Sequence, residues 1–107
     1  MRLIFLPSAA QDLARLREFV EPKNPAAAAR IAGRLYAAAE QLLRAPELGR
    51  PIEGTAFRKL VIRMRRTAYT MCYRFWREGD AIVIVRIWHG RERQEDVVPH
   101  ENDNEPT

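Results

Sequence analysis

The sequence predicts an α+β domain in which a helical hairpin packs on one face of a largely antiparallel four-stranded sheet. Three observations support this class. Residues 81–88 are almost continuously apolar and β-branched, which is typical of a strand buried on both faces. Residues 57–64 and 68–76 precede it and alternate in character, as strands do. Two segments with apolar residues at helical spacing, 8–21 and 25–44, come before these strands.

The chain opens with an apolar strand over residues 2–6, followed by the first helix. We expect Ser8 to cap that helix and Gln11 to complete a capping box. The helix should end at Glu21, because the residue before Pro22 resists the helical conformation. Its buried stripe is Leu13, Leu16, Phe19 and Val20.

The second helix should start at Pro25 with Asn24 as its cap and run to about Arg44. Its many alanines permit close approach to the first helix, and the short connection favours an antiparallel hairpin. Gly33 lies in mid-helix at a cost of about 1 kcal/mol relative to alanine. Close packing against a neighbouring element would explain that glycine.

Breaker residues separate the helices from the last three strands, so the predicted order is strand, helix, helix, strand, strand, strand. Residues 45–51 form the first connection, and residues 65–67 the second. Residues 77–80 should form a hairpin turn in which Gly79 supplies a positive φ. The sheet face away from the helices should be the more polar and basic one.

Length, composition and charge bound the function. With 107 residues and 47% hydrophobic residues, the chain is one folded domain, which we place at residues 1–93. Residues 94–107 hold five acidic residues and no Lys or Arg, and we expect a disordered tail. The formal net charge of +4 therefore combines +9 on the body with −5 on the tail. Such a basic body indicates an anionic partner, although the arginine-rich composition is an alternative explanation.

Several kinds of function are not expected. No apolar run approaches the roughly 20 residues that span a bilayer, and no signal peptide is recognisable, so we expect a cytoplasmic protein without membrane contact. With His89 and His100 as the only histidines and Cys72 as the only cysteine, we expect neither a metal site nor a cofactor. Cys72 should be a small buried residue without reactivity.

Four parts of the chain resemble one known family. They are the Pro7–Leu13 segment after the first strand, the Asn24–Arg30 helix start, the Pro46–Pro51 loop, and Tyr73–Arg74 together with Val85–Arg91. In this order and spacing they resemble the ParE/RelE superfamily of bacterial type II toxin–antitoxin toxins, and its ParE branch in particular. The resemblance implies the fold given above, and a ParD-like antitoxin that wraps and neutralises the toxin in a hetero-oligomer. It implies as target either DNA gyrase, for ParE-type toxins, or messenger RNA on the ribosome, for RelE-type toxins.

Cleavage of RNA without a metal needs a base, cations and an acid. RelE-type toxins resemble each other in using lysines, arginines and often a tyrosine near the carboxyl end. The corresponding candidates here are Lys59, Arg74, Arg86 and His89. Arginine is a poor general base, and no tyrosine follows Tyr73. We therefore expect no catalytic residues and gyrase inhibition by binding, with the ribosome-dependent endoribonuclease as the alternative.

Two sets of residues are candidates for partner contacts. Basic residues of the sheet and its exit should bind the target, although an acidic antitoxin segment could also be their partner. This set is Arg63, Arg65, Arg74, Arg86, His89, Arg91 and Arg93. Apolar residues that the sheet cannot fully cover should bind an antitoxin helix. This second set is Leu16, Phe19, Leu35 and Trp88.

Overall fold

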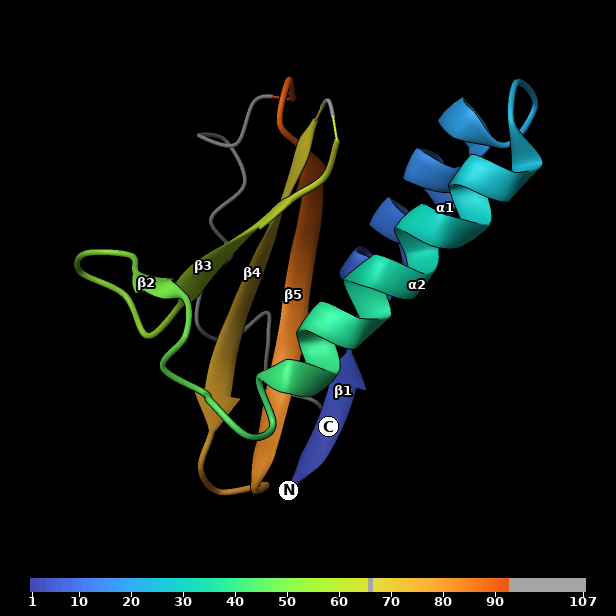
Figure 1. Cartoon of the computed structure of the whole chain (residues 1–107). Helices are drawn as coiled ribbons and strands as arrows, with labels where there is room; N and C mark the ends of the chain where they lie inside the picture. Colours follow the sequence, from blue (N-terminus) through green and yellow to red (C-terminus); the bar gives the residue numbers. More distant parts are fainter. Residues whose placement is uncertain (66, 93–107) are drawn as a thin grey trace.

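A computed structural model describes residues 1–65 and 67–92 and contains two helices packed on a mixed five-stranded sheet (Figure 1). The predicted fold class is confirmed, and the sheet order is β1-β5-β4-β3-β2. Strand β1 pairs with β5 in parallel, and the other pairs are antiparallel. The elements are β1 (Arg2–Phe5), α1 (Pro7–Val20), α2 (Pro25–Gln41), β2 (Arg50–Pro51), β3 (Arg58–Arg63), β4 (Ala68–Trp76) and β5 (Ala81–His89).

The predicted count of four strands was wrong by one short strand. Residues Arg50 and Pro51 form β2, which pairs with Lys59 and Arg58 at the edge of the sheet. Proline is tolerated at such an edge because its missing N–H removes no bond from a central ladder. The loop predicted over 45–51 therefore ends in a strand.

Strand β5 lies between β1 and β4 and is buried on both faces, as its continuous apolar sequence predicted. Ile82, Ile84 and Ile87 belong to the core beneath the helices. Val83 and Trp88 belong to a second apolar cluster on the opposite face. The strand therefore contributes to two cores at once.

The face away from the helices was predicted to be the more polar and basic one, yet it also carries the second apolar cluster. Strand β5 supplies Ala81, Val83, Val85 and Trp88 to this cluster, and β4 supplies Cys72. The buried members of the cluster are Leu6, Phe57, Cys72, Ala81, Val83, Val85 and Trp88. Lys59, Thr70 and Arg74 lie in register with this cluster, and Arg74 is only 9% exposed.

Helix α1 begins differently from the prediction. Pro7 is its first residue and Leu6 its N-cap, and no side chain caps the helix. The hydroxyl of Ser8 instead donates to the carbonyl oxygen of Val85, at 2.7 Å. The reason lies in the sheet: β1 ends at Phe5, so the edge of β5 beyond it needs hydrogen-bond partners from α1.

Helix α2 begins as predicted but ends earlier. The side chain of Asn24 accepts the backbone N–H of Ala27 at 3.0 Å, which confirms it as the cap. The helix ends at Gln41 instead of Arg44. The close packing proposed for Gly33 is absent, since a Cβ there would meet nothing within 4 Å.

The Pro46–Pro51 loop is clamped onto the sheet by Tyr73. The buried phenol donates to the carbonyl oxygen of Pro46 at 2.7 Å and accepts the backbone N–H of Gly49 at 2.8 Å. A Cβ at Gly49 would lie 2.7 Å from the Tyr73 ring and 2.9 Å from the Lys59 carbonyl oxygen, so only glycine fits. The most characteristic segment of the sequence resemblance thus has a structural role.

In the β4–β5 turn, the positive φ predicted for Gly79 belongs to Asp80, with φ 47°. Asp tolerates this region better than most residues. Gly79 is required for another reason, because a Cβ there would lie 2.1 Å from the Trp76 ring that covers the turn.

Among the described residues, no helix combines the length and apolar character that crossing a membrane requires.

Candidate functional site

The helical hairpin diverges from the sheet towards the α1–α2 turn (Figure 1). Side chains of both helices and of the sheet line a cleft in this region. Its volume is about 570 Å³. The helices supply apolar side chains to one wall, whereas the ends of β4 and β5 supply polar ones to the other. The helical wall comprises Leu16, Phe19, Val20 and Ile31 together with Arg15, and the polar wall consists of Thr67, Tyr69, His89, Arg91 and Glu92.

Phe19 lines this cleft and is 76% exposed, the largest value among the large apolar side chains of residues 1–65 and 67–92. Lys23 Nζ lies 5.9 Å from its ring centroid. An exposed aromatic side chain beside an apolar hollow is a typical anchor for a partner. It is the feature of this region that most clearly indicates protein binding.

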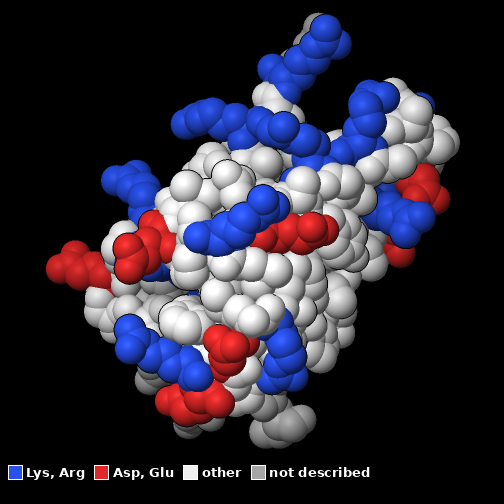
Figure 2. Space-filling model, turned by 60° about the horizontal axis from the view of Figure 1, so that its bottom comes forward, with Lys and Arg blue, Asp and Glu red and all other residues white. Residues whose placement is uncertain are grey.

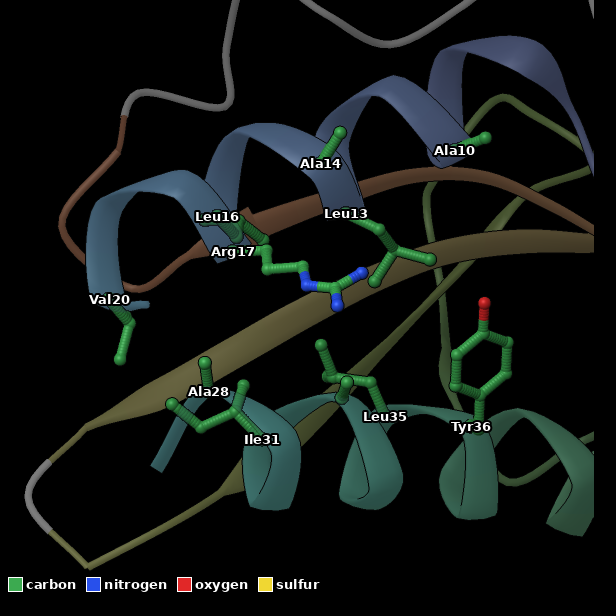
Figure 3. Close-up of a pocket in the computed structure, with 11 residues that line it drawn as sticks. Ala10, Leu13, Ala14, Leu16, Arg17, Val20, Ala28, Ile31, Leu35 and Tyr36 are labelled. Carbon is green, nitrogen blue, oxygen red and sulfur yellow. The ribbon is translucent and has the colours of Figure 1, made fainter. Parts of the chain in front are cut away.

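A smaller groove of about 240 Å³ runs between α1 and α2 (Figure 3). Alanines at positions 10, 14 and 28 keep its walls low, and the side chains of Leu13 and Ile31 point into it. Leu16, Val20 and Ile31 line both this groove and the cleft, so the two hollows adjoin, and we call them together the apolar channel. A channel of this shape fits one face of an amphipathic helix.

The structure separates the four residues predicted to bind the antitoxin. Leu16 and Phe19 line the cleft, and Leu35 lies beneath the groove between the helices at 2% exposure. Trp88 lies on the opposite face of the sheet at 1% exposure. Only the first three therefore lie on the helical side of the sheet, and of these only Phe19 is exposed.

His89 is held in place by two hydrogen bonds. Its Nδ1 accepts the backbone N–H of Arg91 at 3.1 Å, which leaves the ring proton on Nε2 to donate to Thr67 Oγ1 at 2.7 Å. Its ring packs edge-on against Tyr69, with the centroids 5.3 Å apart. Burial and the nearby Glu92 carboxylate raise the pKa of Tyr69, so its phenol stays protonated at neutral pH.

The residues of the alternative nuclease hypothesis do not converge on one point. Lys59 and Arg74 belong to the face of the second apolar cluster, whereas His89 faces the cleft under the helices. Lys59 Nζ and the Arg86 guanidinium lie 5.7 and 5.5 Å from the Trp88 ring centroid. Cys72, on the same rung as Lys59, has its thiol pKa raised to about 12 by burial. The sheet itself lies between His89 and the other candidates.

Arg86 is tied to a residue that the sequence reasoning missed. Asp12 of α1 is 2% exposed and accepts Arg86 Nε at 2.7 Å and Arg86 Nη2 at 3.1 Å. It also accepts the backbone N–H of Ile87 at 2.8 Å and Arg15 Nη1 at 2.6 Å. A shift of register between β4 and β5 at Cys72/Tyr73 lies beside this contact. The sequence spacing could have indicated this contact, because Ser8, Asp12 and Arg15 are four and three residues apart and so share the helical face that meets β5.

Three of the predicted target-binding arginines gather at one end of the sheet, which we call the arginine end: Arg63, Arg65 and Arg91. All three are exposed, and His89 lies beside them at the end of β5. Arg74 lies away from this end and is buried, Arg86 is paired with Asp12, and Arg93 lies outside the described residues.

The excess of positive charge does not cover the whole molecule. On the face shown in Figure 2, which brings the lower end of the Figure 1 view forward, basic and acidic side chains are interspersed. Within residues 1–65 and 67–92, no group of three or more His, Cys, Asp or Glu side chains could hold a metal ion.

Comparison with known proteins identifies close relatives. Residues 3–94 match the family model described as ParE toxin of type II toxin–antitoxin system, parDE. Toxin RelE1 of Caulobacter vibrioides is 36% identical over 80% of this chain and 89% of its own length. Toxin RelE3 of the same organism is 35% identical over 82% of this chain and 92% of its own length.

Two solved structures share the fold. The chromosomal ParDE system of P. aeruginosa has a chain with a TM-score of 0.68 and 24% identity, covering 83% of this chain and 95% of that one. The RelBE2 toxin–antitoxin complex of Mycobacterium tuberculosis gives a TM-score of 0.58 and 26% identity, over 82% and 95% of the two chains.

Proposed function

The chain belongs to the ParE toxin family of type II toxin–antitoxin systems, and from this premise we propose that it inhibits DNA gyrase by binding. A ParD-like antitoxin neutralises it in a hetero-oligomeric complex in the cytoplasm. The inhibition uses no hydrolytic chemistry of the toxin's own. ParE and RelE toxins share one scaffold, so the target has to be argued from the site.

One observation carries the choice of a binding mechanism: the sheet separates His89 from Lys59 and Arg74. General acid–base cleavage of RNA needs the general acid and the general base within hydrogen-bonding reach of the same phosphodiester. In addition, the Arg86 guanidinium is paired with the Asp12 carboxylate, which reduces its ability to stabilise a phosphorane. Both observations support a toxin that inhibits its target by binding and not by cleavage.

The arginine end is the surface that we assign to the target. All three arginines are exposed: Arg63 ends β3, Arg65 lies in the β3–β4 connection, and Arg91 follows β5. Exposed guanidinium groups of this kind suit carboxylates on a large protein surface. His89 then serves to hold the Arg91 backbone through its Nδ1.

The purified toxin should inhibit gyrase in a supercoiling assay. Replacing Arg63, Arg65 and Arg91 together by Glu should weaken inhibition at least about tenfold, since several charged contacts change sign. Arg77→Glu, in the β4–β5 turn at the other end, is the matched control and should change it less than about twofold. Unaffected supercoiling with the unmodified toxin, and no trapped cleavage complex, would refute gyrase as the target.

We assign the apolar channel of the cleft and groove to the antitoxin. Phe19→Asp should weaken antitoxin binding by about tenfold or more, because it places a charge where an apolar anchor is needed. Phe75→Asp is the control, because Phe75 is also exposed, at 37%, but lies on β4 away from the channel. Binding is measured by calorimetry with the antitoxin encoded beside the toxin. Equal losses for the two variants would contradict this assignment.

The second candidate is a RelE-like, ribosome-dependent endoribonuclease, favoured by the relatives named Toxin RelE1 and Toxin RelE3. Its residues would be Lys59, Arg74, Arg86 and His89. Primer extension on messenger RNA after induction should then show codon-phased cuts, which disappear in the Lys59→Ala and His89→Ala variants. Translation that continues without such cuts would exclude this candidate.

A further inference from the structure

Three arginines from separate parts of the chain line one hollow at the opposite end of the sheet from the arginine end. Arg44 follows the end of α2, Arg58 begins β3, and Arg77 lies in the β4–β5 turn. The end of α2 and the β4–β5 turn both lie at the lower end of the view in Figure 1. The hollow has a volume of about 630 Å³. We call it the lower pocket, and its lining includes the three arginines with Glu47, Leu48 and Phe75.

Positive charge dominates the lower pocket. Of the described residues that line it, only Glu47 is acidic, so three arginines and one glutamate give a formal net charge of +2. Among residues 1–65 and 67–92, none of the three guanidinium groups forms an ion pair with a carboxylate. A concave surface with such an excess of one charge attracts a ligand of the opposite charge. The lower pocket therefore suits an anion.

Arg58 is held in place before any ligand binds. Its Nη1 donates to the carbonyl oxygen of Gly49 at 2.8 Å and, at the longer distance of 3.4 Å, to that of Glu47. Both bonds use Nη1, so within the described part of the chain Nε and Nη2 keep their N–H groups for a ligand. A guanidinium with a fixed orientation loses little conformational entropy when it binds a phosphate.

Phe75 adds an aromatic surface to the same pocket. Its side chain is 37% exposed, whereas Tyr73, two residues earlier on β4, is fully buried. The central guanidinium carbon of Arg77 lies 5.8 Å from the Phe75 ring centroid. An accessible ring with a cation beside it can stack with a planar base while the cation binds a phosphate. Leu48, which is 46% exposed, adds apolar surface nearby.

We propose that the lower pocket binds a nucleoside triphosphate. The guanidinium groups of Arg44, Arg58 and Arg77 bind the phosphates, and the Phe75 ring stacks with the base. The volume of the pocket falls within the range of about 300–1,000 Å³ that is usual for small-molecule sites. The lower pocket lies away from both the apolar channel and the arginine end. This site therefore goes beyond the proposed function and does not depend on it.

The lining favours a single nucleotide over a single-stranded nucleic acid. Proteins that bind single strands combine several aromatic rings with a basic groove that follows the backbone. Of the described residues that line the lower pocket, Phe75 alone is aromatic. One ring matches one base, and three arginines match one chain of phosphates.

Calorimetric titration of the full-length protein with ATP tests this proposal, in about 0.1 M salt and without divalent cations. AMP should bind at least about fivefold more weakly than ATP, because it carries fewer negative charges for the arginines. When ATP is added to the ¹⁵N-labelled protein, the amide resonances of Leu48 and Phe75 should shift. Those of Tyr69 and His89 in the cleft should stay unchanged.

Two variants separate the ring from the charge. Phe75→Leu should weaken ATP binding at least about fivefold, yet change the affinity for inorganic triphosphate, which has no base, less than about twofold. Arg77→Gln should weaken the binding of both ligands at least about fivefold. Arg30→Gln is the matched control, because it removes the same charge from an exposed position in the first half of α2. It should change either affinity less than about twofold.

Four results would overturn the proposal. The first is no binding of ATP at millimolar concentration, and the second is an equal loss in Arg77→Gln and Arg30→Gln, which would show non-specific attraction. The third is unchanged ATP affinity in Phe75→Leu. The fourth is a single-stranded oligonucleotide that displaces ATP and binds at least about tenfold more tightly, since the pocket would then belong to a nucleic-acid site.

Discussion

The Asp12 carboxylate should be among the most important polar groups for stability, and replacing it is the sharpest test of the fold. It is 2% exposed and accepts hydrogen bonds from the guanidinium of Arg86, that of Arg15 and the N–H of Ile87. In Asp12→Ala, the guanidinium of Arg86 and the N–H of Ile87 lose this acceptor inside the protein. The carboxylate therefore joins α1 to β5 beyond the end of β1.

The magnitude follows from burial. Removing one partner of a buried ion pair costs about 3–5 kcal/mol. The Arg86 side chain is 21% exposed, so water can partly solvate it, and we expect Asp12→Ala to lower the free energy of unfolding by about 3 kcal/mol. For a chain of this size that corresponds to a midpoint about 12–20 °C lower. Asp12→Asn keeps an acceptor for Ile87 and should lose about 2 kcal/mol.

Urea unfolding followed by circular dichroism measures these losses. Glu21→Ala is the control, because it removes the exposed i,i+4 pair with Arg17 and should change stability by less than about 0.5 kcal/mol. In a double-mutant cycle, Asp12→Ala and Arg86→Met should show a coupling free energy of about 2 kcal/mol. A loss below about 1 kcal/mol in Asp12→Ala, or no coupling to Arg86, would refute the reasoning.

Three further predictions concern stability. Tyr73→Phe leaves the buried N–H of Gly49 without its acceptor and should cost about 1–3 kcal/mol in urea unfolding, whereas Tyr36→Phe, at a half-exposed phenol, should cost little. Gly33→Ala should raise stability by about 0.5–1 kcal/mol in the same assay, because the added methyl meets open space in mid-helix. Burial raises the pKa of the Cys72 thiol from 9.0 to about 12, so the unfolded chain ionises first and stability falls as pH rises from about 9 to 12. Thermal unfolding across that range should show a shallower decline in Cys72→Ala, and a decline identical to that of the unmodified protein would contradict this.

Much of the fold could be predicted because its signals are local. The continuous apolar run of 81–88 identified the central strand, and Asn24 with Pro25 identified the start of α2. The strand β2 was missed because two residues carry no periodicity, and its pairing with β3 depends on the Tyr73 clamp across 24 residues. Such a contact has no local pattern in the sequence.

The candidate site was harder to predict, because its composition depends on which face each side chain takes. Lys59 and His89 are both basic residues near strand ends, and only the register places them on opposite sides of the sheet. Phe19 was included in the helical stripe, yet the hairpin diverges from the sheet there and leaves it exposed. The position of Ser8 likewise matched a helix cap until β1 proved to end at Phe5.

The two edges of the sheet differ in how the outward backbone groups of their strands are hydrogen-bonded. Beyond Phe5, the outer edge of β5 is satisfied by the side chains of Ser8, Asp12 and Arg15, which replace a strand with one helical face. Beyond the end of β2, the outer edge of β3 accepts a side-chain hydrogen bond from Arg34 within the part of the chain that the structure describes. That bond is exposed, whereas the Asp12 carboxylate at the other edge is 2% exposed. Asp12→Ala should therefore lower the free energy of unfolding far more than Arg34→Ala does. Equal losses of the two variants in urea unfolding would contradict this difference between the edges.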